Sequence, residues 1–338
     1  MHNFKAIILA GGSGERFWPL STPEKPKQFL NVFGGESLIR QSVSRLKGLV
    51  KPEDVFVITS KALVAATRKE IPEIPKANIV GEPMRRDTGA AVALGVGVAS
   101  CVSRASGLES ASPLKKDVVL GFFPSDQMVA NPVKFRKAVA AAIARAKRKD
   151  AIVTIGIKPT YPATGFGYVN PKTGQFVEKP NEAKAKQYLK KGYLWNAGMF
   201  IGRAEVFKAA FAAHASALVP LLMSPVSRLK SCYAALPKIS FDFAVMEKLK
   251  NVEVVPGDFG WDDVGSYGAF DKYFLHDARG NVREGPCTVV EADGNICVAR
   301  SARISLLGVK NLVVVTTPDA VLVADKGRVA EMKKLFVR

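Results

Sequence analysis

The N-terminal segment constrains the fold most, because a largely apolar run, Phe4–Ala10, leads directly into a turn that contains Gly11, Gly12 and Gly14. Strands whose residues are apolar on both faces are typical of parallel sheets that are covered on both sides. Glycines at the carboxyl end of such a strand let backbone N–H groups approach a phosphate closely. We therefore expect a buried first strand whose exit carries a ligand site, as in open α/β sheets.

Buried strands and helical patterns alternate along the chain as far as about residue 280. The strands expected after the first are 55–59, 118–123 and 152–157, and the expected helices are 38–50, 61–70, 89–101 and 134–149. This alternation indicates a parallel sheet with helices on both faces. The helix over 134–149 is basic, but one of its faces is apolar and should lie in the core. That face consists of Phe135, Ala138, Val139, Ala142, Ile143 and Ala146.

After Gly280 the chain changes to short β-rich runs at roughly 8–12-residue spacing, which is typical of an all-β unit. These runs are 287–290, 296–299, 304–307, 312–316 and 321–324, with a terminal helix expected over 329–335. We therefore predict a large α/β domain over 1–280 and a small β domain over 281–338. The small domain is interpreted as a dimerisation or packing module.

The glycine-rich turn matches neither of two well-known phosphate-binding loops. It lacks the Gly-Lys-Ser/Thr of a Walker A loop, and Phe17 stands where G-x-G-x-x-G requires its third glycine. Three prolines (Pro19, Pro23 and Pro26) keep the following segment extended as far as Lys27. Such a segment can aim Arg16 and Lys27 at a phosphate chain. The alternative interpretation is two surface cations in a loop.

The chain is strongly basic, with 49 Lys and Arg against 30 Asp and Glu and a net charge of +19. This balance indicates either an anionic partner, such as a phosphorylated substrate, or a solvated basic surface. No aromatic interleaving or nucleic-acid motif accompanies the charge, so we do not expect binding to nucleic acid.

Histidine and long apolar runs are both scarce. The three histidines, His2, His214 and His276, form no triad or metal motif, so we do not expect histidine to act as general base. No apolar run reaches the roughly 18–20 residues that a membrane span requires, and the N-terminus lacks a secretory pattern. We expect a cytoplasmic protein without a membrane partner.

Nine segments, in order along the chain, resemble the sugar-1-phosphate nucleotidylyltransferase family. They include Leu-Ala-Gly-Gly-Ser-Gly-Glu-Arg at 9–16, Phe-Pro-Ser-Asp at 123–126, Val-Glu-Lys-Pro at 177–180, Trp-Asn-Ala-Gly-Met-Phe at 195–200 and Trp-Asp-Asp-Val-Gly at 261–265. The other matches are 26–29, 82–83, 164–168 and 242–248. The continuation Phe-Trp-Pro-Leu-Ser at 17–21 favours the mannose and guanosine branch of the family.

The resemblance implies a three-layer, Rossmann-like nucleotidyltransferase domain with a mixed, mostly parallel sheet, and a small C-terminal left-handed β-helix-like domain. It implies that GMP is transferred from GTP to α-D-mannose 1-phosphate, giving GDP-mannose and pyrophosphate, with Mg²⁺ as cofactor. Separately from the resemblance, association through the small β domain would give a homodimer. The attacking sugar phosphate is already ionised at neutral pH. Such a reaction therefore relies on positioning and charge neutralisation, in agreement with the scarcity of histidine.

By the same resemblance, the catalytic residues are Arg16, Lys27, Asp126, Lys179 and Asp263. Asp126 and Asp263 would bind the Mg²⁺ ion, for which carboxylate oxygens are suitable ligands. Taken alone, Asp126 also fits an ordinary turn or an N-cap before Pro132. Asp262 is the nearest rival to Asp263.

The remaining predicted site residues divide between the nucleotide and the sugar phosphate. The nucleotide set is Gly11, Gly12, Ser13, Gly14, Glu15, Arg16, Lys27, Glu82, Pro83, Asp87, Thr88 and Ser125. The sugar-phosphate set is Gly165, Glu178, Lys179 and Asn196, with Lys179 on the phosphate and Glu178 and Asn196 on sugar hydroxyls.

Asp87 departs from the family pattern, which has asparagine there. An aspartate can accept hydrogen bonds from guanine but cannot donate them as asparagine does. The same reaction with another nucleotide, or with another hexose or heptose 1-phosphate, therefore remains an alternative. A non-catalytic protein that binds nucleotide sugars is a second alternative.

Overall fold

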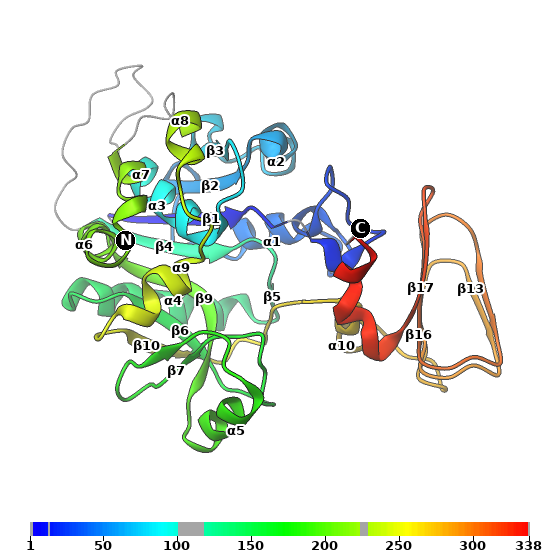
Figure 1. The fold of residues 1–338 in the computed structure, drawn as a ribbon. Helices are drawn as coiled ribbons and strands as arrows, with labels where there is room; N and C mark the ends of the chain where they lie inside the picture. The colour runs from blue at the N-terminus through cyan, green and yellow to red at the C-terminus, as the bar shows by residue number, and fades with distance from the viewer. Residues whose placement is uncertain (1–2, 13, 101–117, 224–228, 337–338) are drawn as a thin grey trace. The chain divides into compact units, whose positions relative to one another are not determined.

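The computed structural model describes residues 3–12, 14–100, 118–223 and 229–336 (Figure 1). The chain divides into two compact units. The first unit comprises Met1–Gly11, Arg40–Ser125 and Val129–Trp261, and the second comprises Gly12–Ile39, Asp126–Met128 and Asp262–Arg338.

The second unit includes the glycine-rich segment as well as the C-terminal tail. Phe17 and Phe33 belong to the same buried cluster as Tyr267 and Val282, because aromatic side chains from both parts of the chain pack together. The Phe17 and Tyr267 rings, for example, have their centroids 5.3 Å apart. The glycine-rich segment and the C-terminal tail therefore share one buried cluster within the second unit.

The first unit is built on a nine-stranded sheet whose main path runs β10-β6-β9-β4-β1-β2-β3; off this path, β7 pairs with β9, and β8 pairs with β7. The strands are β1 Phe4–Ala10, β2 Val55–Ser60, β3 Ile79–Glu82, β4 Val119–Pro124, β6 Val153–Ile157, β7 Tyr168–Val169, β8 Phe176–Val177, β9 Leu194–Arg203 and β10 Glu253–Gly257. Along this path β9 runs antiparallel to both of its neighbours, and the other neighbouring pairs are parallel. The predicted mixed, mostly parallel sheet is confirmed.

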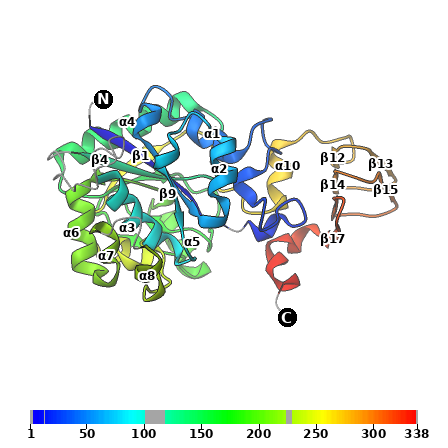
Figure 2. The ribbon, with the colours of Figure 1, turned by 90° about the horizontal axis from the view of Figure 1, so that it is seen from above.

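Helices cover both faces of this sheet. On β4, Phe122 packs against Phe207 of α6 (Ala204–His214) with ring centroids 5.0 Å apart, and Phe123 packs against Phe135 of α4 (Pro132–Arg148) at 6.1 Å. Because successive strand residues point to opposite faces, α6 and α4 lie on opposite sides. Figure 2 shows α4 on one side of the sheet and α6 on the other, together with α3 (Asp87–Ser100) and α7 (Pro220–Met223). The predicted three-layer arrangement is confirmed.

The helices are α1 Leu38–Ser44, α2 Val64–Glu70, α3 Asp87–Ser100, α4 Pro132–Arg148, α5 Glu182–Lys190, α6 Ala204–His214, α7 Pro220–Met223, α8 Leu229–Ala234, α9 Phe241–Ala244 and α10 Phe270–Tyr273. The apolar face predicted on α4 is confirmed residue by residue. The helix predicted over 38–50 is wrong in length, because α1 ends at Ser44 and Gly48 adopts a left-handed φ of 87°. Glycine is the residue most readily accommodated in that conformation.

The parallel strands of the first unit bring several predicted site residues to one edge of the sheet. In the strand register Leu9 of β1 lies beside Pro124 of β4, and Ser60 of β2 lies beside Glu82 of β3. Gly11 therefore follows β1 at the same edge where Ser125 follows β4. This is the edge at which open α/β sheets bind their ligands.

The tail of the second unit is a stack of short strands, and its predicted β-helix-like architecture is confirmed. The strands are β12 Val282–Glu284, β13 Cys287–Val290, β14 Ile296–Ala299, β15 Ile304–Leu307, β16 Leu312–Thr316 and β17 Val321–Asp325. Strands β12, β14 and β16 pair in parallel in one sheet, and β13 and β15 do so in another. Strand β17 is antiparallel to β16 and leads into a 3₁₀ segment, Lys326–Leu335, where a terminal helix was predicted.

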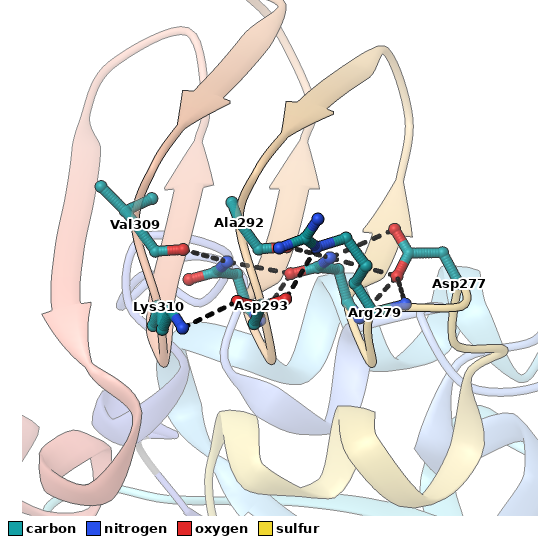
Figure 3. A network of polar contacts seen from close by, with 8 residues as sticks. Asp277, Arg279, Ala292, Asp293, Val309 and Lys310 are labelled. Carbon is teal, nitrogen blue, oxygen red and sulfur yellow. Dashed lines mark hydrogen bonds and ion pairs between the residues drawn. The ribbon is translucent and has the colours of Figure 1, made fainter.

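Buried asparagines join the successive coils of this tail. Asn295 donates through Nδ2 to Asn281 Oδ1 at 2.9 Å and to the Val309 carbonyl at 3.2 Å, and its Oδ1 accepts from Leu312 N at 2.9 Å. Ion pairs link the coils as well, because Asp293 pairs with Arg279 on one side and with Lys310 on the other (Figure 3). Each turn of the chain is thus bonded to the next, which fixes the register of the coils.

Two further short strands, β5 Met128–Val129 and β11 Trp261–Asp262, lie where the chain passes between the two units. Within the described residues, no helix is both long and apolar enough to span a membrane.

Candidate active site

One pocket in the second unit brings together most of the residues predicted to act on phosphate. Arg16, Lys27, Asp126 and Asp263 all line it, although they come from three separate parts of the chain. The complete lining is Gly14, Glu15, Arg16, Phe17, Lys27, Asp126, Asp263, Gly265 and Lys333. Lys179, the fifth predicted catalytic residue, belongs to the first unit.

Lys27 lines this pocket and is almost completely buried, with 8% of its side chain exposed. Its Nζ donates to Asp126 Oδ2 at 3.0 Å and to the backbone carbonyl of Asp263 at 2.7 Å. The ammonium also lies 5.9 Å from the centre of the Phe17 ring. A buried charge requires such partners, so Lys27 is held in one position between the two aspartates.

Gly14 lets the glycine-rich loop close onto Lys27. Its φ is +66°, and a Cβ at this position would lie 2.5 Å from the backbone nitrogen of Lys27. The Gly14 carbonyl accepts a hydrogen bond from Ser21 Oγ at 2.6 Å, which fixes the loop from its other side. Only glycine fits both this φ and this close approach.

Asp126 and Asp263 fit the donor set of a divalent cation. Burial raises the pKa of the Asp263 carboxyl, and the charge of Asp126 raises it further, while Lys27 and Arg16 oppose this shift. A cation between the two carboxylates would relieve their repulsion. Among the described residues no third acidic, histidine or cysteine side chain joins them, so substrate oxygens and water would complete the coordination of an ion such as Mg²⁺.

The structure contradicts the N-cap interpretation of Asp126, although the residue does lie in a bend directly after β4. The N-cap of α4 is Asn131, whose side chain accepts from Lys134 N, so Asp126 does not serve that helix. Asp262 accepts from Val264 N and pairs with Lys272, and it is absent from the pocket lining. Asp262 therefore shapes the turn that carries Asp263.

A second group of predicted residues lies in the first unit, around the turn that contains Glu178 and Lys179. Lys179 has a φ of +44° and its Nζ lies 2.9 Å from Glu178 Oε1. Burial raises the pKa of the Glu178 carboxyl, and its hydrogen bond and ion pair with Lys179 lower it. The Glu178 side chain is 6% exposed, whereas that of Lys179 is 53% exposed and available to an anion.

Gly167 is the glycine that approaches this turn, and Gly165 is not. A Cβ on Gly167 would lie 2.6 Å from Glu178 Oε2, and the Gly167 carbonyl accepts from Asn196 N at 2.8 Å. A Cβ on Gly165 would meet no described atom within 4 Å. Nothing in the structure therefore requires glycine at 165.

Asn196 is buried in a hydrogen-bond network of its own. Its Oδ1 accepts from Thr154 Oγ1 at 2.8 Å and from Gly198 N at 3.0 Å, and its Nδ2 donates to Asp242 Oδ1 at 3.0 Å. Burial and the neighbouring Glu178 raise the pKa of Asp242 above its usual range. Asn196 thus presents little free hydrogen-bonding capacity, and Asp242 was not predicted as a site residue.

Glu247 holds the Glu178 turn from a distant part of the sequence. Its Oε1 accepts from the backbone nitrogen of Glu178 at 2.7 Å. Glu247 itself is exposed to solvent. It lies in the segment Asp-Phe-Ala-Val-Met-Glu-Lys at 242–248, which carried the family resemblance but had no residue assigned a role.

The end of β3 forms a third part of the candidate site. Burial raises the pKa of the Glu82 carboxyl to about 7, and its hydrogen bond from the Tyr233 hydroxyl, at 3.1 Å, lowers it. The other oxygen of Glu82 would lie 3.5 Å from a Cβ on Gly11. Glu82 and Gly11, both predicted to bind the nucleotide, are therefore neighbours, and Tyr233 is a contact that the sequence did not reveal.

The other predicted nucleotide residues are placed in several ways. Asp87, with a φ of +64°, begins α3 and accepts from Thr88 N at 2.7 Å. Thr88 Oγ1 accepts from Phe241 N at 2.9 Å, and Ser125 N donates to the Leu9 carbonyl at 3.1 Å. Pro83 is half-buried directly after Glu82, Gly12 is exposed, and Ser13 lies outside the described residues.

The sequence matches the family model for nucleotidyl transferases over residues 5–279, and the model for the MannoseP isomerase/GMP-like β-helix domain over residues 285–338. A mannose-1-phosphate guanylyltransferase of Salmonella montevideo is 34% identical over 358 residues, covering 97% of this chain and 72% of the relative. The xanthan biosynthesis protein XanB of Xanthomonas campestris pv. campestris is also 34% identical, covering 99% and 73% of the two chains.

Solved structures include a similar chain of nearly the same extent. A Thermus thermophilus protein described as a mannose-1-phosphate geranyltransferase has a TM-score of 0.84 to this chain at 35% identity. The match covers 99% of this chain and 98% of the other. The similarity therefore includes both the sheet-based unit and the β-helix-like tail.

Proposed function

Since the chain belongs to the nucleotidyl transferase family, we propose that it transfers GMP from GTP to α-D-mannose 1-phosphate, giving GDP-mannose and pyrophosphate. The observation that carries the proposal is the pocket in which Lys27 lies between Asp126 and Asp263 beside the glycine-rich loop. This arrangement supplies two carboxylates for a cation and fixed positive charge for a polyphosphate, which are what phosphoryl transfer requires.

The chain's own residues orient and neutralise the two anionic substrates. Lys27 and Arg16 would bind the phosphates of GTP, and the exposed Lys179 would bind the phosphate of the sugar. The sugar-phosphate oxygen attacks the α-phosphorus in line and needs no base, since it is already ionised.

Enzymes of this family use a divalent metal ion, and we propose that Asp126 and Asp263 bind Mg²⁺ here. When bound, such an ion neutralises negative charge on the transferring phosphoryl group.

Guanine is the base that the Glu82 carboxylate favours. Guanine presents two neighbouring donors, N1–H and the 2-amino group, whereas adenine presents an acceptor at N1. The Glu82 carboxyl is fixed by Tyr233 and lies near Gly11, and in its ionised form it can accept from such a pair of donors. Asp87, an acceptor where the family has asparagine, is compatible with the same base.

The proposal is tested by pyrophosphate release from the purified chain with Mg²⁺ and mannose 1-phosphate, when GTP, ATP, UTP and dTTP are supplied separately. We expect release with GTP at a rate well above that with the other three nucleotides. Faster release with another nucleotide would overturn the guanosine assignment. Binding of GDP-mannose without any release would favour a nucleotide-sugar-binding protein instead.

Glu247 gives a separate prediction about the sugar-phosphate residues. The Glu247→Ala variant is expected to raise KM for mannose 1-phosphate about tenfold, because the Glu178 N–H loses its charged acceptor and the turn is freed. The KM for GTP should stay unchanged. Glu247→Gln keeps an acceptor oxygen and should retain most of the wild-type KM, and equal effects of both substitutions would contradict this role.

Glu247→Gln should also change how KM for mannose 1-phosphate depends on pH. Glu178 accepts sugar hydroxyls when it is ionised, so KM for mannose 1-phosphate should rise as the pH falls through its pKa. Burial raises this pKa and Lys179 lowers it, whereas Glu247 and Asp87 raise it by their like charge. Glu247→Gln removes one of these charges and should move the rise in KM to lower pH.

We also infer that the protein forms a homodimer and acts in the cytoplasm, as predicted from the sequence. Sedimentation of the full chain and of a variant truncated at residue 280 tests whether the tail is responsible for association.

A further inference from the structure

We propose that Lys333, near the C-terminal end of the chain, binds the β- and γ-phosphates of the nucleoside triphosphate and the pyrophosphate that leaves. The proposal rests on the function proposed above and deepens it, because it gives the β-helix-like tail a residue in the phosphate pocket. Lys333 lines the same pocket as Lys27, Asp126 and Asp263.

The segment that carries Lys333 is anchored on both sides of this residue. Val329 and Met332 are buried in the same cluster as Phe17, which itself lines the pocket. On the other side, the Phe336 ring meets Trp18 edge to face, with centroids 5.9 Å apart. Contacts before and after Lys333 therefore fasten the segment to the loop that follows Gly14.

Lys333 differs from the neighbouring basic residues in having its charge available. Arg328 and Lys334 both pair with Glu331, at 3.0 Å and 2.6 Å. Within the described residues, no hydrogen bond or ion pair engages the Lys333 ammonium.

The other two cations of the pocket differ in the hydrogen bonds that they already make. Lys27 is already bonded to Asp126 and to the Asp263 carbonyl. Arg16 reaches the Gly265 carbonyl only at 3.5 Å. A nucleoside triphosphate brings several negative charges into this pocket, so Lys27 alone leaves much of that charge without a partner. Lys333 and Arg16 are positioned to supply the remaining positive charge.

The chemistry expected of Lys333 is binding of a polyphosphate, and it requires no proton transfer. An ammonium group is a flexible point charge that suits terminal phosphate oxygens. In the reverse reaction, attack of pyrophosphate on GDP-mannose, the same group would bind the attacking pyrophosphate. Loss of Lys333 should therefore weaken the binding of GTP and of pyrophosphate by the same factor.

The test compares Lys333→Met with Lys334→Met in the full chain at fixed ionic strength. Both substitutions remove one positive charge from the same segment, but only Lys333 lines the pocket. For Lys333→Met we expect KM for GTP, and KM for pyrophosphate in the reverse reaction, to rise about tenfold. KM for mannose 1-phosphate and the Tm should not change. Lys333→Arg, which keeps the charge, should restore most of the affinity.

Unchanged KM values for GTP and pyrophosphate in Lys333→Met would overturn the proposal. Equal effects of Lys333→Met and Lys334→Met would also overturn it, because they would indicate a general effect of charge. Calorimetric titration of the wild type and of Lys333→Met with Mg²⁺ and inorganic pyrophosphate separates this proposal from the proposed function. Weaker binding in the variant supports Lys333 even if no nucleotide is turned over, and equal binding contradicts it.

Discussion

The Asp126→Asn variant is expected to lose about 10³-fold in kcat while its fold remains intact. The substitution keeps the shape of the side chain but removes the carboxylate charge that faces Lys27 across 3.0 Å. The side chain is 35% exposed and the asparagine Oδ1 can still accept from Lys27, so the fold should remain intact. The Tm should fall, because the buried Lys27 ammonium loses its charged partner. The loss arises because the charge that would hold the metal ion and balance Lys27 is gone.

Single-turnover and steady-state pyrophosphate release, with Tm as the check on folding, measure this effect. Asp258→Asn is the matched control, because Asp258 pairs with Lys134 at the surface, is 94% exposed and lies outside the pocket lining. It should behave as the wild type. An Asp126→Asn enzyme with wild-type kcat would remove Asp126 from the proposed metal site.

The Gly14→Ala variant should lose both activity and stability. Its methyl group would lie 2.5 Å from Lys27 N and 2.6 Å from Lys27 Cβ, and its φ of +66° disfavours any residue with a Cβ. Together these costs come to about 3 kcal/mol, which corresponds to a fall in Tm of roughly 5 °C or more. A displacement of Lys27 of about 1 Å should lower kcat/KM about 10²-fold.

Gly12→Ala is the control for the stability part of this prediction. A Cβ on Gly12 would meet no described atom within 4 Å, so the Tm should remain that of the wild type. Thermal unfolding of the two variants side by side measures the difference. Equal Tm values for Gly12→Ala and Gly14→Ala would show that the close approach to Lys27 does not constrain the loop.

Local sequence patterns predicted the strands whose residues are apolar on both faces. The Phe4–Ala10 run and the runs near Val55 and Val118 became neighbouring parallel strands, because their apolar residues had to be covered on both faces. Strand β9 was not predicted as a strand, although Trp195 and Asn196 in it were noted as a motif. Strand β9 lies between β4 and β6 because the chain runs back antiparallel to both of them, and no local sequence pattern encodes this.

The residues that position others were the ones that sequence reasoning missed. Asp126 and Lys27 follow recognisable motifs, so their meeting in one pocket could be anticipated from the resemblance. Glu247 acts on Glu178 through a single hydrogen bond across 69 residues of sequence, and Tyr233 reaches Glu82 across 151. Such contacts leave no periodicity in the chain. Gly167 was also not predicted as a site residue, since only tertiary packing brings it close to Glu178.

Because β17 runs antiparallel to β16, the chain leaves the coils at the end where β16 begins. In the register of this pair, Asp325, the last residue of β17, lies opposite Leu312, the first residue of β16. The Lys326–Leu335 segment thus begins at the same end of the coils as Asn295, where Lys326 Nζ donates to the Gly294 carbonyl. A parallel final strand would release the chain at the opposite end, roughly 15 Å away for a strand of this length. The reversal of the final strand therefore places the Lys326–Leu335 segment at the end of the coils where Gly294 and Asn295 lie.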